Sequence, residues 1–390
     1  MHIKKLTLTS FILLLCFQVC LSAYAQNKEV KQDKLIFASE IIRHGDRTPT
    51  ATLPTAPYAW PEGLGELTAI GMQQEFKLGQ EFRKFYITQE KLLPNNYDPK
   101  TLYVRSSNFN RTLMSAQSVL LGLYPLGTGP RLANNKYALS SGFQPIPIHT
   151  IEVSKDDLLV AHDTKRIEFN NLVKQIVYQT PKWQKQNKQL AEKFKQWSKA
   201  LEIPINNLDD VFSLGDNLYI RQLHQAPIPK GLSQQDLDEI IHWSAVVQAE
   251  EYMPRQIGVL TGKDLLVNLR DKMQEKINLQ TNNKTNNKPA DFILYSGHDI
   301  SLLAFLSAIG APAKINPPYA SHISVRLFQT SNIEAANKNK DKDKDKNKNL
   351  SKNTYYFTVL LNNKAVTIPG CSNSNQCNLL QLNTIIKQLD

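Results

Sequence analysis

The chain has 390 residues, of which 41% are hydrophobic and 21% are charged, and its formal net charge is +11. This is an ordinary globular composition, which excludes a wholly disordered, collagenous or coiled-coil chain. The length is enough for two domains, or for one large domain with an insertion.

The N-terminal segment has the three parts of a secretory signal peptide. Lys4 and Lys5 form a short basic region, an apolar run spans residues 11–21, and Ala-Tyr-Ala at 23–25 forms an A-x-A cleavage site. We therefore predict that residues 1–25 are a signal peptide and that the protein is exported, either to the periplasm or out of the cell. The alternative is an uncleaved anchor. The run is short for a transmembrane helix, so we expect no stable membrane insertion after cleavage.

The next part of the chain alternates between predicted strands and helices. Short apolar, β-branched runs predict strands, and apolar positions at helical spacing predict helices. In chain order we expect a strand at 34–42, a helix at 67–85, a strand at 101–104, a helix at 111–121 and an extended segment at 145–148.

A helical block then interrupts this pattern, from about residue 156 to residue 270. Its amphipathic stretches lie at 166–178, 183–201, 234–247 and 261–279, and a polar linker at 280–288 ends it. Strand character then resumes. We expect a strand at 291–295, a helix at 299–308 and two antiparallel strands at 322–328 and 355–361.

This order of elements predicts an α/β fold interrupted by a helical insertion. Residues 26–130 and 289–390 would form one discontinuous α/β domain that shares a sheet, and residues 131–288 would form a smaller helical cap domain. Between the last two strands, residues 331–353 alternate lysine with aspartate. Such a segment buries nothing, so we predict a disordered, solvated loop there.

The positive charge raises the question of a nucleic-acid or membrane-surface partner. The two signal-peptide lysines and a net charge of +3 in residues 331–353 account for five of the eleven charges. No predicted helix carries a basic stripe interleaved with aromatic residues. We therefore expect no nucleic-acid partner.

Four cysteines become two after signal cleavage, namely Cys371 and Cys377. An exported protein meets an oxidising compartment, so we predict one short-loop disulfide. Two cysteines with no nearby histidine are too few ligands for a structural zinc site. We expect no metal and no cofactor.

Three polar motifs each follow directly on a predicted strand. RHGDRTP at 43–49 follows the first strand, RSSNFNRT at 105–112 follows the second, and SGHD at 296–299 follows the third and opens a helix. Ligands of open α/β sheets bind outside the carboxyl ends of the strands. The motifs would meet there if the strands are neighbours. The converging set is Arg43, His44, Arg47, Arg111, His298 and Asp299.

This set is a cationic pocket with one carboxyl group. Arginine forks match phosphate oxygens and stay charged at any working pH. Two arginines beside one histidine would be costly without an anion, so phosphate is the natural ligand. The arginines should also lower the pKa of His44, which keeps its ring deprotonated in mild acid.

The residue types predict a covalent mechanism. No serine or cysteine stands in a nucleophile motif, so His44 is the candidate nucleophile for the slow hydrolysis of a phosphate monoester. The three arginines and His298 would hold the phosphate oxygens. Asp299 would protonate the leaving alkoxide and then deprotonate the attacking water. An acid that must be protonated predicts an acidic pH optimum. Five further histidines have no clear partner in the sequence, and we interpret them as structural: His149, His162, His224, His242 and His322.

These motifs resemble those of the histidine acid phosphatase family, in clade 2 of the histidine phosphatase superfamily. The resemblance implies a phosphoglycerate mutase-like fold, with a central mixed sheet flanked by helices and a helical cap inserted. It also implies His44 as the phosphorylated residue, Asp299 as proton donor, and phosphate ligands at Arg43, Arg47, Arg111 and His298. Two further segments resemble prostatic and lysosomal acid phosphatases: SGFQPIPIHT at 141–150 and PGCSNSNQC at 369–377, the latter resembling their C-terminal disulfide.

The sequence departs from the family pattern at two places. Asn108 and Asn110 stand where acidic residues usually precede the third arginine, and Ile300-Ser301 follows the His-Asp pair where phytases typically have asparagine at the second position. The second departure and the few cysteines favour a broad acid phosphatase acting on phosphate monoesters. The alternatives are a phytase or another specialised phosphomonoesterase, a phosphomutase, and a non-enzymatic phospholigand-binding protein. Many relatives form dimers, so the resemblance also allows a homodimer.

Overall fold

The structure is a computed structural model, and it describes residues 33–281, 289–330, 354–371 and 375–389. The predicted signal peptide at 1–25 and the Lys/Asp segment at 331–353 lie outside the described residues. The account that follows concerns the unit made of Lys34–Gln329 and of the chain from Thr354 onward.

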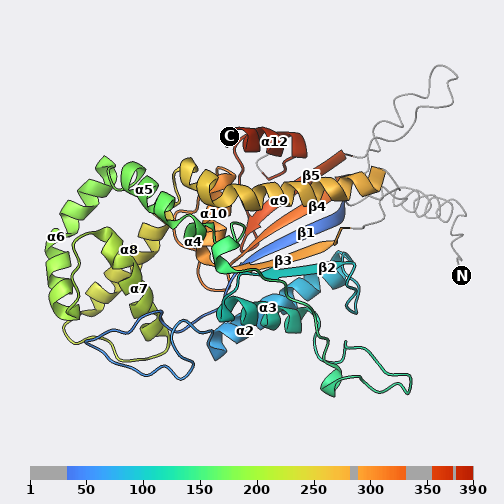
Figure 1. The fold of residues 1–390 in the computed structure, drawn as a ribbon, viewed down its shortest axis with the longest axis horizontal. Helices are drawn as coiled ribbons and strands as arrows, with labels where there is room; N and C mark the ends of the chain where they lie inside the picture. Colours follow the sequence, from blue (N-terminus) through green and yellow to red (C-terminus); the bar gives the residue numbers. More distant parts are fainter. Residues whose placement is uncertain (1–32, 282–288, 331–353, 372–374, 390) are drawn as a thin grey trace, which may run out of the picture. The chain divides into compact units, whose positions relative to one another are not determined.

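Six strands form one mixed sheet, in the order β2-β3-β1-β4-β5-β6 (Figure 1). β1 is parallel to β3, β3 is parallel to β2, and β4 is antiparallel to β1. The N- and C-terminal parts of the chain therefore share one sheet, and the predicted fold class is confirmed. The strands are β1 (Lys34–Arg43), β2 (Leu102–Ser106), β3 (Phe292–Gly297), β4 (His322–Thr330), β5 (Thr354–Leu361) and β6 (Lys364–Ala365).

The two strands that carry the first and third motifs are buried on both faces. Every residue of β3 is buried, and in β1 only Lys34 is exposed. Continuous apolar runs of this kind are typical of strands covered on both sides. The parallel register pairs Arg43 with Gly297 and Ser106 with Ser296. The carboxyl ends of β1, β2 and β3 consequently meet at one edge of the sheet.

Helices cover both faces of the sheet (Figure 1). Alternate residues of β1 face opposite sides: Ala38 and Ile42 pack into one core, whereas Phe37 and Ile41 pack into the other. The first core is closed by α2 (Ala69–Phe82) and α3 (Asn110–Leu123). The second is closed by α9 (Arg255–Thr281), α10 (Asp299–Ala308) and α12 (Leu379–Lys387).

A block of helices with its own core lies beside the sheet (Figure 1). Leu53, from the loop after β1, and Leu303 of α10 also belong to this core, so apolar contacts join the block to the rest of the unit. The division into an α/β domain and a cap at 131–288 stays a prediction. The block contains α5 (Arg166–Ile176), α6 (Pro181–Leu201), α7 (Leu208–Leu223) and α8 (Gln234–Glu251), and the short helix α4 (Ala161–Thr164) precedes it.

The structure differs from the sequence predictions in some elements. Helices α7 and α12 were not among the predicted elements, and the helix predicted at 67–85 continues beyond α2 as a π-helix, Arg83–Gln89. Helix α7 lies inside the segment at 156–270 that was predicted to be mostly helical, although no separate stretch was predicted for it. The predicted Cys371–Cys377 disulfide is present.

Candidate active site

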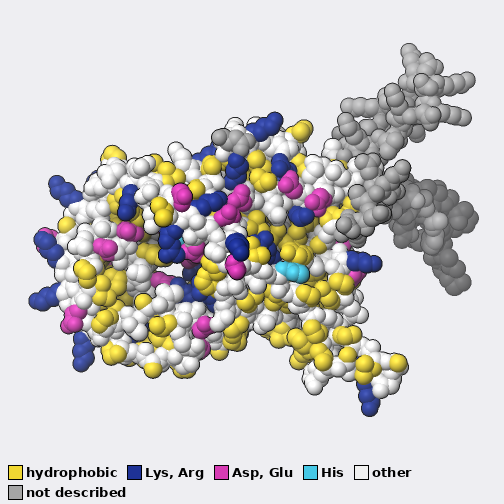
Figure 2. All heavy atoms as spheres, viewed as in Figure 1, with side chains coloured by type: hydrophobic (Ala, Val, Ile, Leu, Met, Phe, Trp, Pro, Cys, Tyr) yellow, Lys and Arg dark blue, Asp and Glu magenta, His cyan; other side chains and the backbone are white. Residues whose placement is uncertain are grey.

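The three motifs meet at the carboxyl edge of the sheet. His44, Arg47, Arg111, His298 and Asp299 line a cavity of about 630 Å³, whose other walls come from α4, α5, α7 and α8. Arg43 joins them, because its Nη2 atom lies 2.9 Å from Asp299 Oδ2. The structure thus brings together all six predicted site residues. On the face shown in Figure 2, acidic and basic side chains border an opening in the surface.

His44 is buried, with 3% of its surface exposed. Its Nδ1 atom lies 2.8 Å from the carbonyl oxygen of Gly45. A carbonyl can only accept, so Nδ1 carries the ring proton and Nε2 keeps its lone pair. Burial, His298 and the three site arginines all lower the pKa of His44 well below its ordinary value. The ring is therefore neutral in mild acid.

The loop that carries His44 is pressed against α2. A Cβ atom on Gly45 would lie only 2.4 Å from the carbonyl oxygen of Gly71, so no larger residue fits there. The backbone N–H of Gly45 donates to Ser115 Oγ on α3 at 3.1 Å. Both helices on this face of the sheet thus position the candidate nucleophile.

Arg43 is held on three sides. Besides the ion pair with Asp299, its Nη1 atom donates to the carbonyl oxygen of Pro317 at 2.5 Å. Its guanidinium carbon lies 4.2 Å from the centre of the Tyr319 ring, in a cation–π contact. The loop after α10 therefore orients this arginine.

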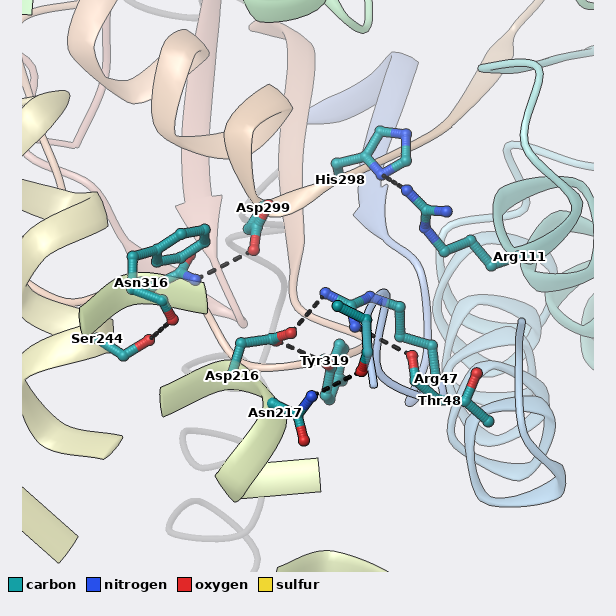
Figure 3. Close-up of polar contacts among 12 residues, drawn as sticks. Arg47, Thr48, Arg111, Asp216, Asn217, Ser244, His298, Asp299, Asn316 and Tyr319 are labelled. Atoms are coloured by element: carbon teal, nitrogen blue, oxygen red, sulfur yellow. Dashed lines mark hydrogen bonds and ion pairs between the residues drawn. The ribbon is translucent and has the colours of Figure 1, made fainter. Parts of the chain in front are cut away.

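Arg47 is paired with a second carboxylate, which the sequence analysis did not find. Its Nη2 atom lies 2.9 Å from Asp216 Oδ2 on α7, and its Nη1 atom donates to the carbonyl oxygen of Thr48 at 3.1 Å (Figure 3). Asp216 also accepts a hydrogen bond from the Tyr319 hydroxyl at 3.2 Å. The predicted set with one carboxyl group thus has a second one, Asp216, paired to it, and Asp163, Asp209 and Glu251 line the same cavity.

Arg111 and His298 lie side by side. Arg111 Nη2 is 3.5 Å from His298 Nδ1, and the guanidinium carbon is 4.6 Å from the centre of the Phe109 ring. The other ring nitrogen of His298 is 2.9 Å from Ser107 Oγ. Burial and then Arg111 lower the pKa of His298 to about 3. Burial and Arg47 also lower the pKa of Arg111, to about 10, which still leaves it charged at neutral pH.

Each of the three arginines has one hydrogen-bond donor that lacks a partner. The Nε atoms of Arg43, Arg47 and Arg111 are buried and have no hydrogen-bond partner within the part of the chain that the structure describes. Buried donors of this kind call for an explanation, because leaving them unpaired is costly. An anion with several oxygens, bound among the three guanidinium groups, would satisfy them.

Asp299 is ionised in this arrangement. Burial raises its pKa, but the Arg43 guanidinium, a hydrogen bond from Asn316 and the neighbouring His298 outweigh that effect and bring the pKa to about 2. Asn316 Nδ2 donates to Asp299 Oδ2 at 3.1 Å (Figure 3). The carboxylate therefore has the geometry of a proton-transfer group, but it holds no proton until its surroundings change.

The five other histidines among the described residues all have partners in the structure. His224 Nε2 lies 2.6 Å from Asp46 Oδ2, and His322 Nδ1 lies 2.8 Å from Glu40 Oε2. His149 and His242 have aromatic contacts with Tyr103 and Trp243. His162 contacts the Tyr252 hydroxyl at 3.2 Å and also lines the cavity that contains His44, which its sequence position did not indicate.

Two classes of feature are missing from the described residues. No group of three or more His, Cys, Asp or Glu side chains there is arranged to hold a metal ion. In the same residues, no helix combines the length and apolar character needed to cross a membrane.

Three acid phosphatases are among the proteins that this chain resembles in sequence. Putative acid phosphatase 5 of Caenorhabditis elegans is 29% identical over 78% of this chain and 68% of that protein. Human lysosomal acid phosphatase is 30% identical over 76% of this chain and 67% of its own length. Bovine prostatic acid phosphatase is 30% identical over 82% of this chain and 79% of its own length.

Solved structures with the same fold include two bacterial phytases. The Citrobacter braakii phytase matches with a TM-score of 0.62 at 16% identity, over 91% of this chain and 98% of that chain. A Hafnia alvei phytase in complex with myo-inositol hexakis sulphate matches with a TM-score of 0.62 at 17% identity, over 91% of this chain and 97% of that chain. At these identities the likeness shows the fold alone.

The family itself is shown by a match along the sequence. The model of the histidine phosphatase superfamily (branch 2) covers residues 34–362, which contain all three motifs. With this match and with relatives near 30% identity, the chain belongs to branch 2 of the histidine phosphatase superfamily.

Proposed function

We propose that the chain is an acid phosphatase that hydrolyses phosphate monoesters through a phosphohistidine at His44. Family membership and the acid phosphatase relatives indicate a phosphomonoester hydrolase. The observation that carries the mechanism is the pairing of a buried His44, whose Nε2 lone pair is free, with three arginines whose buried Nε donors lack partners in the described chain. A phosphate group fits both features.

In the first step, His44 Nε2 attacks phosphorus and forms the N–P bond while the bond from phosphorus to the ester oxygen breaks. Asp299 gives its proton to the leaving alkoxide, which departs as an alcohol. The three arginines bind the phosphate oxygens while negative charge redistributes over those oxygens in the transition state. His298 is the fourth proposed ligand, and it needs a proton on Nδ1 to donate to an oxygen.

In the second step, a water molecule attacks the phosphohistidine. Asp299 accepts a proton from that water, the N–P bond breaks, and His44 returns with its Nε2 lone pair. Inorganic phosphate is released. Each group ends the cycle in the state in which it began, so the reaction consumes only ester and water.

The acidic optimum follows from the protonation of Asp299. Without substrate, Arg43 holds its pKa at about 2. A bound phosphate places negative oxygens beside the same cations, which offsets them and raises the pKa of Asp299. A monoanionic ester also brings a proton of its own. The first route needs acid to protonate Asp299. The second needs acid because phosphate monoesters lose their second proton at about pH 6.

The phytase alternative is not favoured. The relatives at about 30% identity are acid phosphatases, whereas the phytase structures match at 16% and 17% identity and share the fold alone. A comparison of phytate with aryl phosphates as substrates separates the two activities.

The direct test compares wild type with His44→Ala in the hydrolysis of p-nitrophenyl phosphate in mild acid. We expect kcat to fall by about a thousandfold or more, as for other nucleophile deletions. The matched control is His242→Ala, because His242 lies on the exposed side of α8 and contacts Trp243. Full activity in His44→Ala would remove the nucleophile assignment.

We also infer that the protein is exported, to the periplasm or out of the cell. The Cys371–Cys377 disulfide supports this, because disulfides persist in oxidising compartments. Fractionation of the producing cell, with N-terminal sequencing of the product, tests both the compartment and the predicted mature start at Gln26.

The homodimer is a separate proposal. Leu126, Leu132, Leu139 and Phe143 are 42% to 56% exposed, in one segment that follows α3, and a second copy would cover such apolar side chains. Sedimentation velocity over a range of concentrations measures the state directly. A monomer at every concentration would contradict the proposal.

A further inference from the structure

We propose that Asp216 determines which ionic form of the phosphate ester the site accepts. Asp216 compensates the charge of Arg47, so the site matches a monoanionic ester better than a dianionic one. Because the monoanion predominates in acid, this preference confines catalysis to acid. This inference rests on the proposed function, and it assigns a specificity role to a residue outside the three sequence motifs.

The first observation is the Arg47–Asp216 ion pair. Its two polar ends lie 2.9 Å apart, and the side chains are only 11% and 17% exposed. Solvent and salt screen such a pair much less than a surface pair. Burial lowers the pKa of Arg47, but Asp216, together with Tyr319 and Asp299, outweighs burial and raises that pKa above its ordinary value. The carboxylate therefore acts as a fixed negative charge beside the phosphate site.

The second observation is that α7 is bound to the loop on both sides of Arg47. Asn217 Nδ2 donates to the carbonyl oxygen of Ala51 at 2.8 Å, and His224 Nε2 lies 2.6 Å from Asp46 Oδ2. The Tyr319 hydroxyl holds the second oxygen of Asp216 (Figure 3). These contacts keep the Asp216 carboxylate against Arg47.

The third observation is the balance of charge. Arg43 is paired with Asp299, and Arg47 is paired with Asp216. Arg111 has no ion pair to a carboxylate among the described residues, and the lowered pKa values of His44 and His298 keep both rings neutral. The three arginines together with Asp216 and Asp299 thus carry one excess positive charge at the phosphate site. A monoanion neutralises it, whereas a dianion leaves one uncompensated negative charge.

Several charged and titratable groups surround Asp216. The small cavity of about 190 Å³ beside it is lined by Arg43, Tyr219 and Tyr319 among others. Burial and then Asp216 raise the pKa of Tyr319, so this phenol stays neutral in acid. The charged and titratable groups that face or lie near Asp216 from the neighbouring elements are Arg43, Arg47, Asp46, Asp210, Tyr219, Tyr319 and Asp299.

The test measures kcat/KM for p-nitrophenyl phosphate between about pH 4 and pH 8 in wild type, Asp216→Asn and Asp238→Asn. This leaving group needs little protonation, so the profile reports which ionic form enters the site. Above the second pKa of the ester, at about 6, wild type should lose activity by about tenfold per pH unit. Asp238 is the control, because it is an exposed acid on α8 and its change removes the same charge at a distance.

In Asp216→Asn we expect the pocket to gain one positive charge and to accept the dianion. The ratio of kcat/KM at about pH 5 to that at about pH 8 should fall by about tenfold relative to wild type. Asp238→Asn should keep the wild-type ratio, and Asp216→Glu should restore it. Loss of structural support alone would lower the whole profile without changing this ratio. An unchanged ratio in Asp216→Asn would overturn the proposal.

Calorimetry with inorganic phosphate separates this inference from the proposed function. We expect Asp216→Asn to bind phosphate at about pH 8 more tightly, relative to acid, than wild type does. If wild type hydrolyses no monoester, the proposed function fails, but the phosphate titrations still decide the role of Asp216. Asp216→Ser serves as the second charge-removing variant if Asp216→Asn does not fold. For each protein, the affinity for phosphate at about pH 8 is divided by the affinity in acid. The same ratio in the folded variant as in wild type would overturn the inference.

Discussion

His44 Nδ1 donates a hydrogen bond to the carbonyl oxygen of Gly45, the next residue, at 2.8 Å. This contact selects one tautomer of the ring, because a carbonyl oxygen cannot donate. Nε2 is thereby left with its lone pair, as the proposed nucleophile requires. One backbone carbonyl thus performs the orienting role that a carboxylate has beside the catalytic histidine of other enzymes.

Gly45 should tolerate no side chain. In Gly45→Ala, the new Cβ would lie 2.4 Å from the Gly71 carbonyl oxygen, so the loop and α2 must separate. We expect a loss of about 1–3 kcal/mol in stability from this overpacking. We also expect a fall of about a hundredfold in kcat, because His44 is displaced. Thermal unfolding and steady-state kinetics measure the two effects.

Gly231→Ala is the control for that experiment. Its φ of +101° makes alanine strained there, but its Cβ would meet Ala200 only at an ordinary 3.5 Å, away from the catalytic cavity. It should therefore lose stability and keep the kcat of the folded protein. Wild-type kcat in Gly45→Ala would contradict the account of the loop.

The acid side of the pH profile should lie well below the ordinary imidazole range. Burial, His298 and the arginines lower the pKa of His44 below its usual 6.5, so the neutral nucleophile persists as pH falls through that value. We expect kcat/KM to stay level or rise as pH falls through 6.5. A fall in kcat/KM with a midpoint near pH 6.5 as pH is lowered would show that the nucleophile has an ordinary pKa.

The same lowered pKa values predict how stability depends on pH. His298 has a pKa of about 3 in the folded protein against 6.5 in the unfolded chain, so the unfolded chain binds more protons between these values. Unfolding free energy should fall as pH falls from about 6.5, by up to about 1.4 kcal/mol per pH unit for this group. Thermal unfolding of His298→Asn against wild type measures it. Equal slopes in the two proteins would argue against a buried neutral His298.

Asp299→Asn should affect substrates according to their leaving groups. The variant cannot donate a carboxyl proton, so alkyl phosphates, whose alkoxides need protonation, should slow by about 100- to 10000-fold. p-Nitrophenolate leaves without help, so p-nitrophenyl phosphate should slow much less in its first step. A burst experiment isolates that step. Equal slowing for both leaving groups would contradict the role of Asp299 as acid.

Much of this site follows from local sequence. Each motif stands directly after a strand, and parallel neighbours bring strand ends to one edge, so His44, Arg111 and His298 could be placed together. Asp216 could not be predicted in this way. It lies in α7, outside the three motifs, and it is 169 residues from Arg47 along the chain. Such a pair depends on tertiary packing, which leaves no local pattern.

The most direct test of the account is to trap the phosphoenzyme. Wild type is mixed with a ³²P-labelled monoester, quenched into alkaline denaturant after a few milliseconds, and mapped by peptide sequencing. The account predicts an acid-labile, alkali-stable label on the peptide that contains His44, and no label in His44→Ala. Turnover without label on His44, or label on another residue, would contradict it.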